Sequence, residues 1–442
     1  MLFRSRQRGW RVAGLHDADA AIYTEFKTAE YLGGYAGPAP RVHLRAGESL
    51  RRYLKPGLED GKTFVFWGMN YNTQGIPGPE RSRTWVNQPE KMYGSKKGSG
   101  FIPGQVRFAN AVYTYRPDFA GGTYKEGTID ETDERVTFEF QTPYVIGCTP
   151  PGNAKWGIYE PGGKNGLVLN GKATCGVKIS TDRGKTWQDA GAASDGLDLT
   201  DFVKGHQQYW IRFEAGAKAL AASGLTMKTV CQTNVATIPR LHDGENKIVF
   251  LAGGTAVLSA GPNKDQAEAH LVDGQMGGKT ATLELTPPRG EKAVRLCAAG
   301  WVASGAPPST TVKYQIEYST DGSKAWKPVV KDWQVVRRDP DPKDFWSQSF
   351  CWGEVALEPV AGPVRVRFAN DGGKSYRKVE AHLIYQVAKS GPVEVTFAWR
   401  EGGGAVKQES HTYPAQPGAE DASWTLKTGT QVETVWVEYR AK

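Results

Sequence analysis

The sequence has few of the residues from which metal centres and disulfide scaffolds are built. Its 442 residues include five cysteines and seven histidines. No two cysteines stand in Cys-x-x-Cys spacing, and no histidines stand in His-x-His or His-Glu-x-x-His spacing. We therefore expect no metal site and no cofactor. The cysteines are expected to be buried thiols, with one disulfide if the protein is exported.

Long apolar runs and a strong charge imbalance are also absent from the sequence. No run of apolar residues is long enough to cross a membrane as a helix. The net charge is +8, but basic and acidic residues are interspersed and no nucleic-acid recognition motif occurs. We therefore expect neither a membrane span nor a nucleic-acid partner.

Sequence signatures of catalysis are missing as well. There is no Gly-x-Ser-x-Gly motif and no glycine-rich loop followed by Lys-Ser or Lys-Thr. Asp and Glu occupy 47 positions, and a linear sequence does not show which two of them would flank a sugar as a hydrolytic pair. We predict no catalytic residue, and these absences argue against an enzyme.

The sequence is rich in glycine, proline and tryptophan, with 53, 26 and 14 residues. Together with many short runs that alternate polar and apolar residues, this composition favours antiparallel sheets with elaborate loops. One short helix is expected near the N-terminus, over residues 17–32. The predicted fold class is all-β, built from several antiparallel β-sandwich modules.

An internal repeat lies between residues 136 and 387. Four β-like segments appear twice in the same order, first at residues 138–143, 180–187, 209–213 and 225–230, and then at residues 283–287, 319–326, 364–368 and 380–385. We interpret the repeat as an internal duplication of one β-sandwich module. The expected domains are an N-terminal β-rich domain with long aromatic loops (1–130), two sandwiches (131–236 and 237–389) and a small C-terminal β unit (390–442).

The second segment of each copy has the form Ser-x-Asp-x-x-x-x-Trp, at Ser180–Trp187 and at Ser319–Trp326. In such a hairpin the Asp carboxylate accepts hydrogen bonds from backbone N–H groups of the turn, and the Trp folds back over the strand ends. We therefore assign structural turn roles to Asp182, Trp187, Asp321 and Trp326.

The first hairpin resembles the Asp box, or BNR-type repeat, of sialidases and other secreted glycan-handling proteins. In the sialidase propeller the box recurs in each blade, whereas no further copy lies between Ser180 and Ser319, and Ile238-Pro239-Arg240 reverses the family's Arg-Ile-Pro motif. The resemblance is therefore limited to two hairpins, and a six-bladed propeller is the less favoured alternative.

The β-rich, Trp-rich character of the sequence favours an extracellular or periplasmic protein, such as one at a bacterial surface. Met1-Leu2-Phe3-Arg4 leads directly into arginines, and no apolar segment of a signal peptide follows. This leaves either a cytoplasmic protein or a chain whose N-terminus is truncated. We favour the second, because the β-rich, Trp-rich character is typical of extracellular proteins.

A loop-rich stretch that begins at residue 67 carries many aromatic, amide and guanidinium side chains. Sugars offer apolar C–H faces to aromatic rings and hydroxyl groups to polar side chains. We therefore predict a ligand-binding site of seven residues: Trp67, Asn70, Tyr71, Arg83, Trp85, Asn87 and Tyr93. In the alternative interpretation, these aromatic residues fill the cores of small β domains.

The predicted function is that of an exported carbohydrate-binding or accessory protein with polysaccharide as its partner. One alternative is a glycan-active hydrolase or lyase, and another is a structural cell-surface or filament protein that self-associates.

Overall fold

The structure is a computed structural model. It describes residues 42–55, 57–61, 63, 65, 108–149, 151, 161–234, 238–249, 254–261, 264–288, 290–303, 311–334, 348–372, 376, 378–387, 391–415 and 423–442. The chain is mostly β-strand, arranged in several antiparallel sheets with a few short helices, and this confirms the predicted all-β, sandwich-like fold. The expected helix over residues 17–32 lies outside the described residues.

The described chain divides into two compact units. The larger unit contains residues 43–254 and 389–442, and the smaller unit contains residues 255–388. Strand β3 (Thr128–Thr132) spans residue 130, where one of the expected domain boundaries lies.

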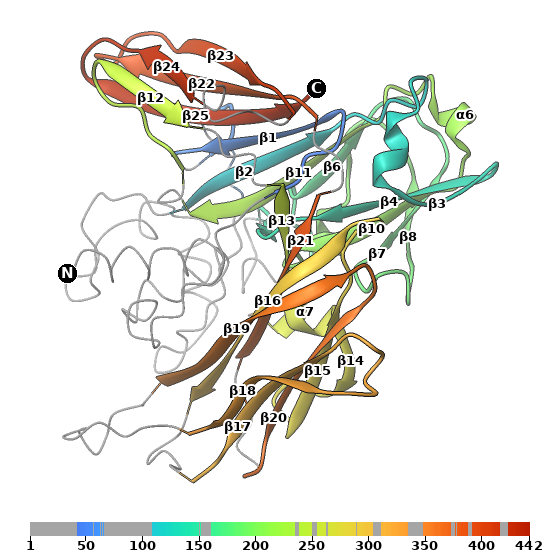
Figure 1. The fold of residues 1–442 in the computed structure, drawn as a ribbon. Helices are drawn as coiled ribbons and strands as arrows, with labels where there is room; N and C mark the ends of the chain where they lie inside the picture. The colour runs from blue at the N-terminus through green and yellow to red at the C-terminus, as the bar shows by residue number, and fades with distance from the viewer. Residues whose placement is uncertain are drawn as a thin grey trace. The chain divides into compact units, whose positions relative to one another are not determined.

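One sheet of the larger unit has five strands in the order β3-β4-β10-β7-β8 (Figure 1). The remaining strands of this sheet are β4 (Arg135–Gln141), β10 (Gln208–Phe213), β7 (Gly176–Ser180) and β8 (Gln188–Ala192). Successive side chains of a strand point to opposite faces. Phe138 and Phe140 of β4 and Ile211 and Phe213 of β10 are therefore buried on the inner face, while the residues between them face outward.

The second sheet of the larger unit has nine strands. Its main path is β23 (Lys407–Tyr413), β22 (Val393–Glu401), β25 (Val432–Ala441), β1 (Glu48–Tyr53), β2 (Phe108–Tyr115), β11 (Thr226–Asn234), β6 (Leu167–Asn170) and β9 (Leu197–Asp198), and β5 (Val145–Ile146) pairs with β11. The C-terminal strands therefore do not form a separate sheet, because β25 pairs with β1 from Ser49 to Tyr53. A two-stranded sheet of β12 (Glu245–Val249) and β24 (Ser423–Lys427) packs its Trp424 into the same core as Phe397.

Short helical turns connect the strands. Among the described residues, the larger unit has the 3-10 helix η2 (Thr123–Gly127), α5 (Thr200–Val203) and α6 (Ala217–Leu220), and the smaller unit has α7 (Lys264–Glu268).

The smaller unit is a sandwich of two sheets (Figure 1). One has the order β13 (Thr255–Ala260), β21 (Lys378–Gln386), β16 (Lys292–Ala303) and β19 (Gln348–Val360). The other has the order β14 (Leu271–Gly274), β15 (Thr280–Leu285), β20 (Val364–Asn370), β17 (Tyr314–Ser319) and β18 (Lys327–Trp333). Their inner faces share one apolar core, which includes Leu283, Leu296, Phe368 and Leu383.

Part of the larger unit has the same strand order as the smaller unit. In each five-stranded sheet the strands, numbered along the chain, run 1-2-5-3-4, and the order β2-β11-β6-β9 matches the order β13-β21-β16-β19. Two facing four-stranded sheets of this kind form a jelly roll. Each jelly roll carries one additional edge strand, β3 in the larger unit and β14 in the smaller one.

Candidate functional site

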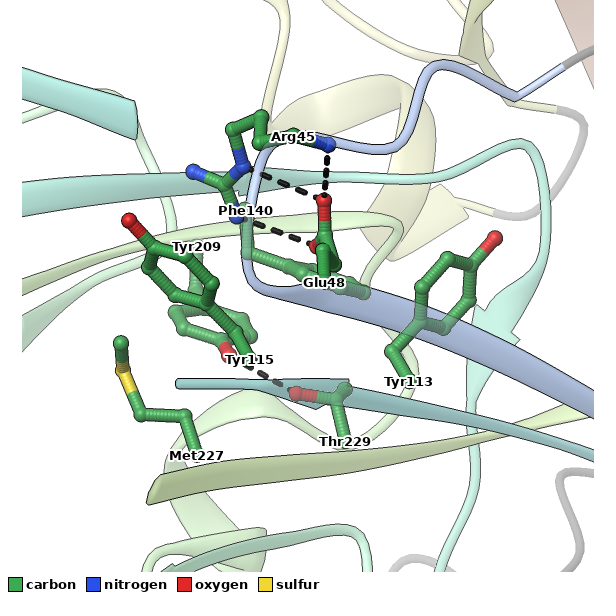
Figure 2. A pocket seen from close by; sticks show the side chains of 8 residues that line it. All are labelled: Arg45, Glu48, Tyr113, Tyr115, Phe140, Tyr209, Met227 and Thr229. Carbon is green, nitrogen blue, oxygen red and sulfur yellow. Dashed lines mark hydrogen bonds and ion pairs between the residues drawn. The ribbon is translucent and has the colours of Figure 1, made fainter. Parts of the chain in front are cut away.

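A small pocket lies in the interior of the larger unit (Figure 2). It is lined by Arg45, Glu48, Tyr113, Tyr115, Phe140, Tyr209, Met227 and Thr229. The volume that the centre of a water molecule can occupy in this pocket is about 10 Å³. This volume is about what one buried water molecule requires. The pocket is therefore too small for a sugar or a cofactor.

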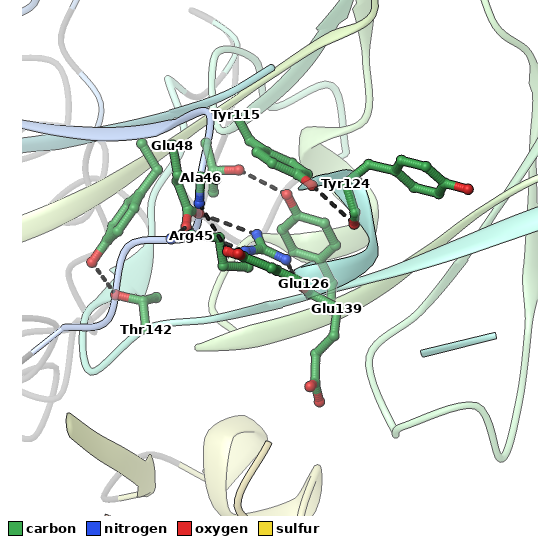
Figure 3. A network of polar contacts seen from close by, with 11 residues as sticks. Arg45, Ala46, Glu48, Tyr115, Tyr124, Glu126, Glu139 and Thr142 are labelled. Carbon is green, nitrogen blue, oxygen red and sulfur yellow. Dashed lines mark hydrogen bonds and ion pairs between the residues drawn. The ribbon is translucent and has the colours of Figure 1, made fainter. Parts of the chain in front are cut away.

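An ion pair between Arg45 and Glu48 lies at this pocket. Arg45 Nε and Nη2 donate to the two carboxylate oxygens of Glu48 at 3.2 and 3.1 Å, and Nη1 donates to the Glu139 carbonyl at 2.7 Å. The guanidinium also lies over the ring of Tyr115, 4.5 Å from its centre. Burial by itself lowers the pKa of Arg45, but the charge and hydrogen bonds of Glu48 together with the neighbouring tyrosines outweigh burial, and the pKa is raised overall. Figure 3 shows this polar network, in which the Arg45 guanidinium is directed at the Glu48 carboxylate.

The tyrosines around the pocket also have internal partners. The Tyr113 hydroxyl pairs with Thr142 Oγ1 at 2.8 Å, and Tyr115 donates to the Tyr124 carbonyl at 3.3 Å. Burial raises the pKa of Tyr115 to about 12, so this hydroxyl is protonated at neutral pH. The polar side chains named here pair with one another and stabilise the sandwich, whereas the side chains on its outer surface are open to a ligand.

The outer face of the five-stranded sheet carries a group of half-buried side chains that we call the tryptophan face. Its members are Glu139 of β4, Lys178 of β7, Trp187 of the β7–β8 hairpin, and Trp210 and Arg212 of β10. The two indole rings are 6.5 Å apart between centres, at an angle of 45°. The Arg212 guanidinium carbon lies 3.9 Å from the centre of the Trp187 ring.

Polar groups border the two rings. Trp210 Nε1 donates to Glu139 Oε1 at 3.1 Å, and the same oxygen accepts from Gln141 Nε2 at 2.8 Å. Arg212 Nε donates to Thr137 Oγ1 at 3.3 Å. The face therefore combines two aromatic rings with a carboxylate, an amide and a guanidinium, which are the groups that sugar recognition uses.

The β7–β8 hairpin holds Trp187 in place through its Asp182 carboxylate. The backbone N–H and the hydroxyl of Thr186 donate to Asp182 at 2.9 and 2.6 Å, and Ser180 Oγ donates to it at 2.8 Å. Burial raises the pKa of Asp182, but these hydrogen bonds outweigh burial and the pKa is lowered overall. Gly184 has a φ of 79°, and a Cβ there would come within 2.5 Å of the Trp210 ring. Glycine therefore allows the turn to pack closely against Trp210.

The corresponding hairpin of the smaller unit has similar contacts. Asp321 accepts from Ser319 Oγ at 2.7 Å and from the backbone N–H groups of Lys324 and Ala325 at 3.0 and 3.1 Å. The Arg367 guanidinium lies over Trp326, 4.1 Å from the ring centre.

The predicted ligand-binding residues are not among those that form the tryptophan face. Trp67, Asn70, Tyr71, Arg83, Trp85, Asn87 and Tyr93 all lie outside the described residues. Our reasoning from the sequence treated residues 209–213 only as a repeated strand and therefore missed Trp210 and Arg212. The sequence did indicate that Trp210 and Arg212 share one face of this strand, because alternate residues of a strand point to opposite faces and Tyr209, Ile211 and Phe213 occupy the other face.

A serine, a histidine and a glutamate lie together in the smaller unit. Ser259 Oγ is 2.9 Å from His382 Nδ1, and Glu380 Oε2 is 4.0 Å from His382 Nε2. Cys297 is the neighbour of His382 on the next strand. All four residues are buried, and burial raises the pKa of the Cys297 thiol to about 12. Such a thiol is a poor nucleophile at neutral pH, and the cluster offers no accessible group for hydrolysis.

The described part of the chain contains no group of three or more His, Cys, Asp or Glu side chains that could hold a metal ion. No disulfide joins any of the five cysteines, all of which lie in the described part of the chain, and four of them are buried. None of the described helices combines the length and the apolar character that a membrane crossing requires.

No protein-family model and no curated protein matches this chain. Among solved structures, it is weakly similar to that of dimeric latent PorU from Porphyromonas gingivalis, with 8% identity, coverage of 62% of this chain and 31% of that chain, and a TM-score of 0.20. A second similarity is to the structure of infectious bursal disease virus, Gt strain, with 10% identity, coverage of 80% and 85%, and a TM-score of 0.17. This chain thus spans about a third of the PorU chain, and scores this low establish neither a family nor a function.

Proposed function

We propose that this chain is an exported, non-catalytic protein that binds polysaccharide, and that the tryptophan face of the larger unit is its binding surface. The observation that carries the proposal is the pair of half-buried indoles, Trp187 and Trp210, bordered by Glu139 and Arg212 on the outer face of one sheet.

The chemistry of a sugar fits this arrangement. The C–H groups of a pyranose ring pack on an indole, because an aromatic ring combines a large apolar surface with a negative face. The hydroxyl groups of the sugar donate to a carboxylate such as Glu139 and accept from a guanidinium such as Arg212. A pair of rings on one sheet contacts successive sugars of a chain, so the expected ligand is a polysaccharide and not a single sugar.

The two jelly rolls support the further proposal that one sandwich module was copied within the chain. The two jelly rolls have the same strand order. In each five-stranded sheet a Ser-x-Asp-x-x-x-x-Trp hairpin joins the strands that come third and fourth along the chain, β7 to β8 and β17 to β18. Hairpins of this Asp-box type in secreted glycan-handling proteins are also the reason to propose an extracellular or periplasmic location.

Affinity gel electrophoresis of the intact chain against soluble polysaccharides tests the proposed function. The panel contains dextran, dextran sulfate, polygalacturonate and methyl-esterified polygalacturonate. We expect at least one of them to retard the protein, and Trp210→Ala to weaken that binding at least about tenfold, which corresponds to about 1.4 kcal/mol.

The matched control is Trp326→Ala, which removes the corresponding hairpin tryptophan of the smaller unit. We expect this variant to bind as tightly as the unmodified chain. The proposal is wrong if no polysaccharide retards the protein, or if both variants, shown to be folded by circular dichroism, lose binding equally.

A further inference from the structure

The tryptophan face contains two positive charges that lie directly opposite each other. Arg212 of β10 is the register partner of Lys178 of β7. Like charges at directly opposed positions of an antiparallel pair destabilise a sheet. The fold alone therefore gives no reason to place two cations here.

The smaller unit has the opposite arrangement at the same place. Arg367 of β20 is the register partner of Glu317 of β17, and its Nε and Nη2 atoms donate to Glu317 Oε2 at 3.0 and 2.7 Å. The strand order and the stacking of the arginine on a hairpin tryptophan are the same in both units. The difference is that lysine takes the place of the glutamate in the larger unit.

As a result, Arg212 lacks a carboxylate partner among the described residues, and its only described hydrogen bond uses Nε. The Arg212 side chain is half-buried, and its guanidinium carbon lies 3.9 Å from the centre of the Trp187 ring. Lys178 pairs at 3.2 Å with Glu214, and both of those side chains are more than a third exposed. An exposed pair of this kind contributes little to stability and is easily exchanged.

We infer that the tryptophan face selects anionic polysaccharides, with Arg212 as the main contact to a carboxylate or sulfate group and Lys178 as a second one. This inference rests on the proposed function and adds the class of ligand to it. A guanidinium forms two parallel hydrogen bonds with a carboxylate or sulfate. Stacking on Trp187 holds the guanidinium in one orientation, which reduces the entropy that binding would otherwise cost.

Two pairs of polysaccharides that differ only in charge test the inference on the intact chain. Dextran sulfate is compared with dextran, and polygalacturonate is compared with its methyl ester. We expect the charged member of at least one pair to bind about tenfold more tightly or better than its neutral partner. The pair that shows the difference tells whether the anion is a sulfate or a carboxylate.

Variants then place this selectivity on the two residues. Lys178→Glu recreates the pairing of the smaller unit, and it should raise the melting temperature while it reduces binding of the charged polysaccharide at least about tenfold. Arg212→Gln should reduce that binding as well. The control Glu317→Lys creates a like-charged pair in the smaller unit, and it should lower the melting temperature and leave binding unchanged.

Equal affinity for charged and neutral members of both pairs would overturn the inference and leave the proposed function intact. So would charge selectivity that persists in both Lys178→Glu and Arg212→Gln. If no polysaccharide binds at all, the proposed function and the inference both fail.

Discussion

The two five-stranded sheets of this protein share one strand order but carry different chemistry on their outer faces. At corresponding places the larger unit has Trp210 and Lys178, whereas the smaller unit has Arg365 and Glu317. In the smaller unit Arg365 pairs with Glu284 at 2.9 Å and Arg367 pairs with Glu317 at 2.7 Å, so both of these arginines have a carboxylate partner. The comparison shows that the buried faces determine the sandwich, while the outer faces are free to differ.

The largest effect is expected from the interior ion pair of the larger unit. Arg45→Ala would leave Glu48, whose side chain is 5% exposed, buried without its partner. This should cost about 3–5 kcal/mol of unfolding free energy. By contrast Arg367→Ala, which breaks the partly exposed pair with Glu317 in the smaller unit, should cost about 1 kcal/mol or less. Urea denaturation measures both, and similar losses would contradict the distinction between the two pairs.

An intermediate effect is expected where the two hairpins differ in side-chain volume. Gly184 packs against the Trp210 ring at a positive φ, while the corresponding Ser323 has a φ of 77° and its Oγ accepts from Arg365 Nη1 at 3.1 Å. Gly184→Ser combines an unfavourable φ with a clash against Trp210 and should cost about 2–3 kcal/mol.

The reciprocal change provides the control for this prediction. Ser323→Gly relieves the positive φ but loses the hydrogen bond to Arg365, so its effect on the unfolding free energy should stay within about 1 kcal/mol. Equal effects of the two substitutions would show that Trp210 does not restrict the turn.

The smallest effect is expected from the pH dependence of the two turn aspartates. Hydrogen bonds from Ser319 and from the turn backbone lower the pKa of Asp321, and those from Thr186 and Ser180 overcome burial to lower that of Asp182. In the unfolded chain an Asp has a pKa of about 3.9. The stabilisation that the two turn aspartates provide is therefore complete above that pH, and it is lost as the pH falls through their lower pKa values in the folded state.

The double variant Asp182→Asn with Asp321→Asn should therefore be less stable at neutral pH and lose less of its stability between about pH 5 and pH 2. Melting temperatures measured across this range test the prediction. Asp273→Asn changes an exposed Asp outside both turns and serves as the control. A double variant with the same acid sensitivity as the unmodified chain would contradict it.

The all-β fold was predictable because it rests on local patterns. Segments such as 209–213 and 364–368 alternate in polarity, and the hairpins carry their own turn chemistry. The pairing of β25 with β1 was not predictable, because it joins residues such as Arg51 and Glu438 from the two ends of the chain. Nothing local in either strand indicates its partner.

The candidate site was only partly predictable for a related reason. The alternation in residues 209–213 shows that Trp210 and Arg212 share a face, but their neighbours Glu139 and Lys178 come from strands that are distant in the sequence. The ion pair of Arg45 and Glu48 has no sequence signal at all, since two charged residues three apart at a strand start are usually exposed.

Indole N–H nuclear magnetic resonance of the intact chain, titrated with the polysaccharide that it binds most tightly, tests the central claim most directly. The Trp210 and Trp187 signals are assigned by their loss in Trp210→Phe and Trp187→Phe, and the Trp326 signal by its loss in Trp326→Phe. We predict that the Trp210 and Trp187 signals shift with added polysaccharide while the Trp326 signal does not move. Shifts confined to other tryptophans would place binding elsewhere and contradict the assignment of the tryptophan face.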